Sequence, residues 1–219
     1  MMTLTAADGH KFQAFEAGNV NAPRGLVVVQ EIFGVNPHIR AVAERLAGYG
    51  YRVLAPAMFD RVQPGIELDY SPEGIDAGRN TRARIADDQA LLDLEATAAA
   101  FGAGRPVGII GYCWGGSLAW DAAIGTKRFK AANCWYGGGI AAKKHARPNC
   151  PVQMHFGAED HGIPLSDVAA IQAAQPGVEV FVYDGAQHGF GCEARASYSH
   201  KDWELAELRS LAFFAEHLR

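Results

Sequence analysis

Short apolar runs alternate with longer amphipathic segments along the whole chain. The first run, residues 25–30, reads GLVVVQ and lacks polar positions at every second residue, which indicates a strand buried on both faces. Five more runs of strand length follow, at residues 51–55, 106–111, 131–136, 151–156 and 178–183. Buried strands separated by helices are typical of a mostly parallel sheet flanked by helices, so the pattern predicts an α/β fold.

Helices are predicted between these strands, where apolar residues recur at spacings of three and four. The first begins at Pro37, is capped by Asn36 and ends at Gly48 and Gly50. Residues 56–72 are rich in Pro, Gly and Asp and are expected to form a long loop. Further helices are expected at residues 73–100 (broken near Gly78), from the turn after Gly111 through Ile124, at 164–174, and at 201–218 with Leu205, Leu208, Leu211, Ala215 and Leu218 facing the core.

Composition limits the classes of protein to consider. The 219 residues suit one domain, residues 1–219, with a well-filled core. The net charge is −4 and no basic stripe occurs, which argues against nucleic-acid binding. The N-terminus lacks a signal-peptide pattern, and no apolar run reaches the roughly 20 residues that cross a bilayer. The four cysteines form no C-x-x-C pair and are interpreted as thiols, so we expect a cytoplasmic protein without a membrane partner.

The most specific feature is the segment GIIGYCWGGSLAW, residues 108–120. A strand, a turn and a helix surround Cys113, with Gly111 and Gly115 at the positions where a G-x-S-x-G nucleophile elbow needs small residues. The N-terminus of the following helix would favour a thiolate and a nearby oxyanion. A buried structural cysteine is the usual alternative, and we adopt it for Cys134, Cys150 and Cys192. For Cys113, the elbow context favours a nucleophile.

A nucleophilic cysteine needs a base and an orienting acid. In hydrolases with this elbow the chain order is nucleophile, acid, histidine, and Asp160 and His188 follow Cys113 in that order, each just after a predicted strand. His161 competes as the base but adjoins the acid rather than following it. Glu159 and Asp184 are the rivals of Asp160. His155 lies within a predicted strand and is expected to be a core histidine.

Ligands of parallel sheets bind at the carboxyl edge of the strands, so the chemistry is expected in the loops after residues 30, 111, 156 and 183. The first of these loops contains QEIFG, residues 30–34. The backbone N–H of Ile32, together with that of Trp114, could form an oxyanion hole. Glu31 taken alone is best interpreted as a solvated loop glutamate.

Taken together, these segments resemble the dienelactone hydrolase family. The matching pieces occur in family order and span nearly the whole chain: QEIFGVN (30–36), GYCWGG (111–116), WYG (135–137), HFGAEDHGIP (155–164) and AQHGF (186–190). Cysteine in the elbow is the specific point, because most relatives of this fold use serine. The resemblance implies a single α/β-hydrolase domain without a large cap.

The resemblance also implies site residues and a reaction. It carries a Cys-His-Asp triad onto Cys113, His188 and Asp160, and it makes Glu31 a residue that contacts the cysteine and helps to activate it when substrate arrives. Tyr136 matches a tyrosine that lines the family pocket. The implied reaction is hydrolysis of a small ester or lactone through an acyl-enzyme, with no metal and no organic cofactor.

The chain departs from the family at the substrate-binding arginines. The best-known members hold a substrate carboxylate with two arginines, one of them four residues after the catalytic histidine, where this chain has Cys192; the nearest arginine is Arg195. The other falls in the segment 73–85, for which Arg79, Arg82 and Arg84 are the candidates.

Other functions on the same residues stay open. One is a thioesterase or general carboxylesterase using the same triad, and another is a non-catalytic ligand-binding member of the fold, which would be expected to lack triad residues. The expected partner is a small-molecule ester or lactone, and the chain is expected to be a monomer or a small homo-oligomer.

Overall fold

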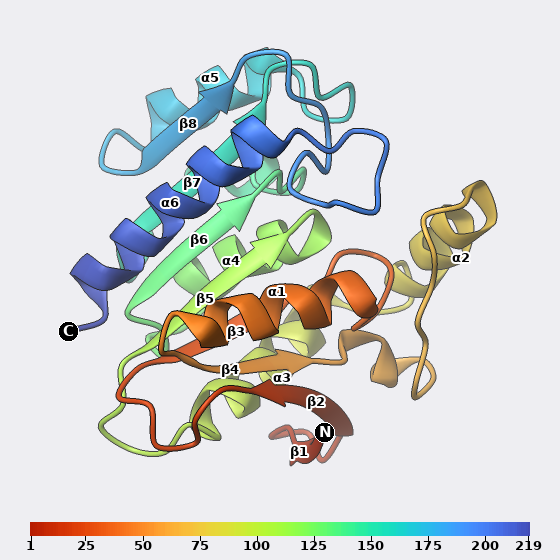
Figure 1. The fold of residues 1–219 in the computed structure, drawn as a ribbon, viewed down its shortest axis with the longest axis vertical. Coiled ribbons are helices and arrows are strands. Elements are labelled where there is room, and N and C mark those ends of the chain that lie inside the picture. Colours follow the sequence, from red (N-terminus) through yellow and green to blue (C-terminus); the bar gives the residue numbers. More distant parts are fainter.

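An eight-stranded sheet forms the centre of the molecule (Figure 1). The computed structural model describes residues 1–219, and the strands lie in the order β1-β2-β4-β3-β5-β6-β7-β8. All neighbours from β4 to β8 pair in parallel. The six predicted strands are confirmed as β3 (Gly25–Val29), β4 (Arg52–Pro56), β5 (Val107–Tyr112), β6 (Ala131–Trp135), β7 (Val152–Gly157) and β8 (Glu179–Tyr183). The predicted α/β class is therefore correct.

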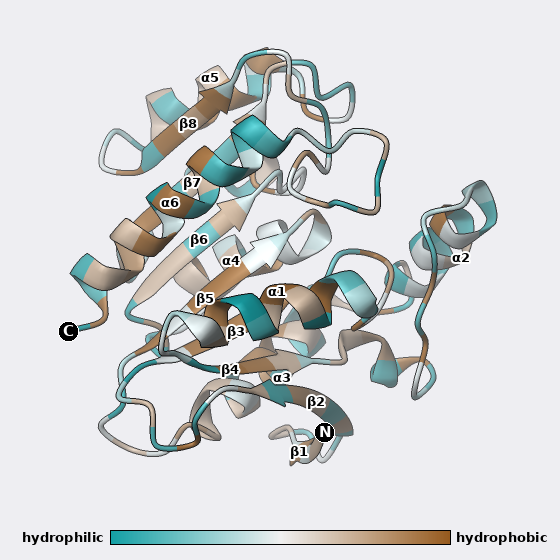
Figure 2. Ribbon diagram, viewed as in Figure 1, coloured by the Kyte–Doolittle hydropathy of each residue, from teal (hydrophilic) through white to brown (hydrophobic).

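Helices cover both faces of this sheet (Figure 1). α1 (Pro37–Gly48) and α6 (His200–His217) lie on one face, and α3 (Asp87–Ala99), α4 (Trp114–Gly125) and α5 (Leu165–Ala174) lie on the other. The central strands are strongly hydrophobic, while the helices carry hydrophilic residues on their outer sides (Figure 2). The main core therefore lies in two layers, one on each face of the sheet. None of the helices has both the length and the apolar character needed to cross a bilayer.

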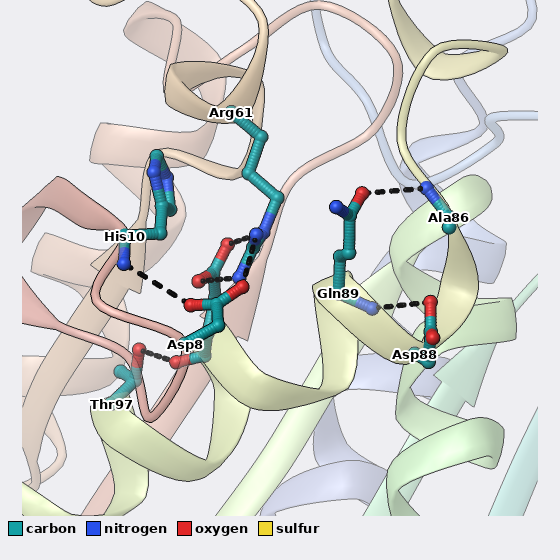
Figure 3. Close-up of polar contacts among 8 residues, drawn as sticks. Asp8, His10, Arg61, Ala86, Asp88, Gln89 and Thr97 are labelled. Atoms are coloured by element: carbon teal, nitrogen blue, oxygen red, sulfur yellow. Dashed lines mark hydrogen bonds and ion pairs between the residues drawn. The ribbon is translucent and has the colours of Figure 1, made fainter.

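An N-terminal hairpin that the sequence pattern did not predict extends the sheet. β1 (Met2–Thr5) pairs with β2 (Lys11–Ala17), and β2 is antiparallel to both of its neighbours. Arg61 links this hairpin to the rest of the protein. Its guanidinium donates one hydrogen bond to Asp8 in the hairpin turn, at 2.8 Å, and two to Asp93 of α3, at 2.7 and 2.8 Å (Figure 3). The ion pairs join the hairpin, the segment after β4 and α3.

The helix expected at residues 73–100 is two helices, and the expected break near Gly78 is wrong. α2 (Pro72–Arg82) runs through Gly78 and ends before residues 83–86, where Ile85 turns into the core. Gly78 has a packing role instead, because a Cβ atom there would lie 2.0 Å from the carbonyl oxygen of Ile32. The predicted loop 56–72 also contains a short 3₁₀ helix, Met58–Arg61. α2 stands apart from the sheet, on the side toward which the parallel strands point (Figure 1).

The predicted core face of the last helix is also largely wrong. Leu205 and Leu208 are 40% and 59% exposed, and Ala215 is exposed as well, although Leu218 is buried as expected. The buried face of α6 consists of Ala206, Glu207, Ser210, Phe213 and Phe214. Leu211 is partly buried and packs against the core, as predicted. The two phenylalanines belong to the core, whereas Leu205 and Leu208 face solvent.

Candidate functional site

Cys113 lies on the sharp turn between β5 and α4. Its backbone has φ 56° and ψ −117°, a conformation that L residues rarely adopt and that is held only where the surroundings enforce it. A Cβ atom on Gly111 would lie 1.9 Å from the carbonyl oxygen of Gly115, and one on Gly115 would lie 2.4 Å from that of Val29. The two glycines of the elbow are therefore required by close backbone packing, as the sequence predicts.

The backbone N–H groups of the two predicted oxyanion-hole residues, Trp114 and Ile32, have no hydrogen-bond acceptor. Trp114 is the first residue of α4, so its N–H has no acceptor within the helix. The N–H of Ile32 likewise donates no hydrogen bond. Ile32, Cys113 and Trp114 line one cavity of about 430 Å³. The two predicted oxyanion-hole residues and Cys113 thus line the same cavity.

His188 is hydrogen-bonded to Asp160, the predicted acid. Its Nδ1 lies 2.7 Å from Asp160 Oδ2, and the other carboxylate oxygen accepts the N–H of Gly162 at 2.8 Å. The rivals Glu159 and Asp184 are exposed and make no such contact with the imidazole. The side chain of Asp160 is fully buried, so its charge is little screened by solvent.

The electrostatics of this pair favour the imidazolium. Burial acts to lower the pKa of His188, but its hydrogen bond to Asp160, the nearby Cys113 and the charge of Asp160 outweigh burial and raise the pKa to about 10. His188 and Cys113 also line the same cavity. Asp160 therefore holds the imidazole at the cavity that Cys113 also lines.

A second cavity, of about 600 Å³, adjoins the first, and His188 and Gly162 line both. Its wall is polar and includes the side chains of Arg79, Arg195 and Tyr70. His161 also lines it but is exposed and lies outside the His188–Asp160 pair. The site thus has a part over the sulfur and a part with two cationic groups.

Glu31 is fully buried and is not the solvated residue that the sequence alone favours. Its Oε2 accepts the hydroxyl of Tyr70 at 2.9 Å, and its Oε1 accepts from the guanidinium of Arg195 at 3.2 Å. Burial raises the pKa of Tyr70 far above its ordinary value, so the phenol stays a hydrogen-bond donor. Sequence reasoning did not find Tyr70, which belongs to a loop without any motif.

The structure places Tyr136 next to the site but behind it. Its ring meets His188 edge-on at 5.2 Å between centroids, its φ is 39°, and its buried hydroxyl has no hydrogen-bond partner. It lines neither cavity, in contrast to the expected pocket position. Tyr136 therefore supports the histidine through packing in this conformation.

The candidate arginines are distributed over both cavities. Arg79 and Arg195 line the polar cavity, whereas Arg82 lines the cavity over Cys113 and lies 5.9 Å from the ring of Trp114. Arg84 is exposed and lines neither. Arg195, although three residues beyond the family position, places its cation against Glu31.

The other cysteines and His155 lie outside these cavities. Cys134 is buried in β6, Cys150 is half-buried, and Cys192 is buried close to Glu31 and His38. His155 is a fully buried histidine with hydrogen bonds to Tyr183 and Gln153, as expected for a core residue.

Comparison with known proteins gives consistent matches over most of the chain. The model of the dienelactone hydrolase family matches residues 12–218. A carboxymethylenebutenolidase of Pseudomonas putida is 31% identical over 226 residues, 98% of this chain and 95% of that protein. A Synechocystis sp. protein provisionally named carboxymethylenebutenolidase is 40% identical over 195 residues, 80% of this chain and 78% of that protein. A crystal structure of a provisionally named dienelactone hydrolase from Klebsiella pneumoniae has TM-score 0.81 and 32% identity, covering 97% of each chain.

Proposed function

Because the chain belongs to the dienelactone hydrolase family and is a carboxylic ester hydrolase, we propose that it opens small lactones and esters through a Cys113-His188-Asp160 triad. The observation that carries the proposal is the strained elbow cysteine in one cavity with the histidine that Asp160 binds. This is the arrangement that nucleophilic catalysis requires: a nucleophile, a base in reach and a group that orients the base.

The proposed reaction has two halves. His188 takes the proton of Cys113, and the thiolate attacks the carbonyl carbon, whose oxygen becomes an oxyanion bound by the N–H groups of Ile32 and Trp114. The intermediate collapses as His188 returns the proton to the leaving oxygen, which opens a lactone ring or releases an alcohol. Water, deprotonated by His188, then cleaves the thioester and restores the thiol. Asp160 keeps the imidazole oriented throughout.

Glu31 supplies a link between substrate binding and Cys113 in this proposal. At rest, Arg195 and Tyr70 hold its carboxylate. A substrate carboxylate in the polar cavity would compete for Arg195 and loosen Glu31, which is then free to act on the cysteine, the role that the family resemblance implies. Anionic lactones would thus be preferred substrates, with Arg79 as a second cation on the same cavity.

A general carboxylesterase is the second candidate. The cavity over Cys113 is partly apolar, with Ile32, Leu118 and Ile163 in its wall. The side chain of Arg79 is 72% exposed, which weakens any clamp that it makes on a carboxylate. These features favour small neutral esters, and turnover of neutral and acidic substrates distinguishes the two candidates.

The test of the triad is the loss of activity in Cys113→Ala. We expect hydrolysis of a chromogenic short-chain ester to have kcat reduced about a thousandfold or more, since triad members act as one unit. Cys113→Ser should keep a little activity, because serine needs more help from its base. Iodoacetamide should inactivate the wild type. Cys150→Ser, at a half-buried cysteine outside both cavities, is the control. Full activity of Cys113→Ala would refute the proposal.

A further inference from the structure

We propose that Glu31, His38 and Cys192 bind one divalent cation of the zinc type, and that its binding switches the hydrolase off. The oxygen, nitrogen and sulfur atoms that could coordinate it all lie within 4.8 Å of one another. The switching half rests on the proposed function, whereas cation binding does not.

The three side chains come from separate parts of the chain and lie together, with Glu31 and Cys192 buried and His38 partly buried. Glu31 follows β3, His38 lies in the first turn of α1, and Cys192 lies in the loop after β8. Carboxylate, imidazole and thiolate are the ligands that zinc uses in proteins, and hard cations such as Mg²⁺ avoid the sulfur. The donor set therefore selects a borderline-soft cation.

His38 provides the independent sign of a ligand. Its Nε2 is buried and has no hydrogen-bond partner in the protein. Such an orphaned buried nitrogen costs free energy and is uncommon unless something binds it. One ring nitrogen of His38 lies within 4.8 Å of ligand atoms of both Glu31 and Cys192, so three donors of a cation site come together here.

The geometry needs only a modest contraction. Tetrahedral zinc holds neighbouring ligand atoms about 3.5 Å apart, which follows from bond lengths of about 2.0–2.3 Å. A cavity of about 390 Å³ lies against His38, one of the three proposed ligands, and is also lined by Asn36, Tyr70 and Ala194. In the proposal the ion enters from this side and a water is its fourth ligand.

Binding would change the charges around Glu31. Cys192 releases its proton to solvent as the sulfur–metal bond forms, so thiolate and carboxylate together balance the dication. The cation takes the carboxylate that Arg195 and Tyr70 now hold. Arg195 is then released into the polar cavity beside His188, and Glu31 can no longer respond to substrate. Hydrolysis should fall as a consequence.

Zinc binding can be measured without any activity. Isothermal titration with Zn²⁺ is made on Cys113→Ala protein, so that the elbow thiol contributes nothing. We expect one ion per chain, and affinity weaker by about a hundredfold or more after adding His38→Gln or Cys192→Ser. Adding Cys150→Ser should change nothing. Because Cys192 is buried, the half-exposed His38 gives the decisive variant. Absence of binding, or equal binding without His38, would overturn the site.

The proposed loss of activity on zinc binding is tested by measuring inhibition of the wild-type enzyme, in which Cys113 is intact. Zn²⁺ should inhibit ester hydrolysis reversibly, with activity restored by a chelator, and His38→Gln should hydrolyse normally but need about a hundredfold more Zn²⁺ for half-inhibition. Equal sensitivity of both proteins would place the inhibiting ion on Cys113 and His188 and refute the switch. If no ester is hydrolysed at all, the proposed function fails, while the titration still decides the site.

Discussion

At the scale of single residues, buried Glu31 forms an ion pair with partly buried Arg195 at the edge of the polar cavity. A carboxylate out of water needs compensating charge and hydrogen bonds, and Arg195 and Tyr70 provide both. Cys192 occupies the sequence position where the family resemblance leads us to expect an arginine. Arg195, three residues further on, lines the polar cavity and donates to Glu31.

Neutralising this cation should affect acidic substrates selectively. We expect Arg195→Gln to raise KM for an anionic lactone about tenfold, and to change KM for a neutral ester little, because an arginine binds a carboxylate through two parallel N–H bonds. Arg79→Gln should have a smaller effect, since that side chain is largely exposed. Steady-state kinetics on both substrates measures this. Arg84→Gln is the control, and equal effects on both substrates would remove the carboxylate from the substrate description.

The His188–Asp160 pair should appear in the pH dependence of stability. The pKa of His188 in the folded protein, about 10, exceeds that of an unfolded histidine, about 6.5. Its stabilisation is therefore complete below about pH 6.5 and is lost as the pH rises toward 10. Asp160→Asn should lower the free energy of unfolding by about 2 kcal/mol near pH 6, and by less near pH 10.

Urea unfolding at several pH values measures this difference. Asp184→Asn, at the exposed rival carboxylate, is the matched control and should show no such trend. A difference between wild type and Asp160→Asn that stays constant with pH would contradict the assignment of the ion pair.

The sequence predicted the elbow and its partners at this scale, but not their surroundings. Cys113 could be found because the turn needs glycines at fixed positions. Asp160 and His188 could be found because each follows a strand, in the chain order that this elbow predicts. The hydrogen bond between Tyr70 and Glu31 joins residues 39 positions apart, and the contact between Glu31 and Arg195 joins residues 164 positions apart. No local pattern encodes such contacts, since only the folded chain brings these residues together.

At the scale of elements, the burial of a strand or helix determines how well its hydrophobic pattern predicts it. The five parallel strands β3 to β7 are buried along their whole length and were predicted to within a residue or two, as was the partly buried edge strand β8. The N-terminal hairpin was missed because β2 is only partly buried and β1 has four residues. The core face of α6 was misassigned because phenylalanines, rather than the regularly spaced leucines, fill the available space. In each case the tertiary environment overrides the local signal.

The packing of α2 on the Ile32 loop gives an element-scale prediction. In Gly78→Ala the new Cβ would meet the Ile32 carbonyl at 2.0 Å, so helix and loop must separate and the N–H of Ile32 moves with its loop. We expect kcat/KM to fall about tenfold to a hundredfold, because small displacements of catalytic groups are costly. Gly48→Ala, where the added atom meets nothing, is the control. Unchanged kinetics in a folded Gly78→Ala protein would show that α2 does not position this loop.

At the scale of the whole molecule, one buried ion pair joins the unpredicted hairpin to the rest. Asp93 is fully buried in α3, and Arg61 binds it through two hydrogen bonds while also holding Asp8 (Figure 3). Burial raises the pKa of Asp93 to about 6, and Arg61 opposes that rise. This cluster lies outside both cavities, so it should affect stability and not the chemistry.

Arg61→Met should therefore destabilise the protein in a pH-dependent way. A carboxyl whose folded pKa is raised contributes stability below about pH 4, and that contribution is lost as the pH rises through about 6. Without Arg61 the pKa of Asp93 rises further, so a charged Asp93 is left unpaired at neutral pH. We expect the free energy of unfolding to fall by about 3–5 kcal/mol near pH 8 and by much less near pH 4.5, as measured by urea unfolding. Arg84→Met serves as control.

Because the cluster around Arg61 lies outside both cavities, kcat of the folded Arg61→Met variant should be unchanged. A loss of stability that does not depend on pH would mean that Arg61 acts through packing rather than through the charge of Asp93.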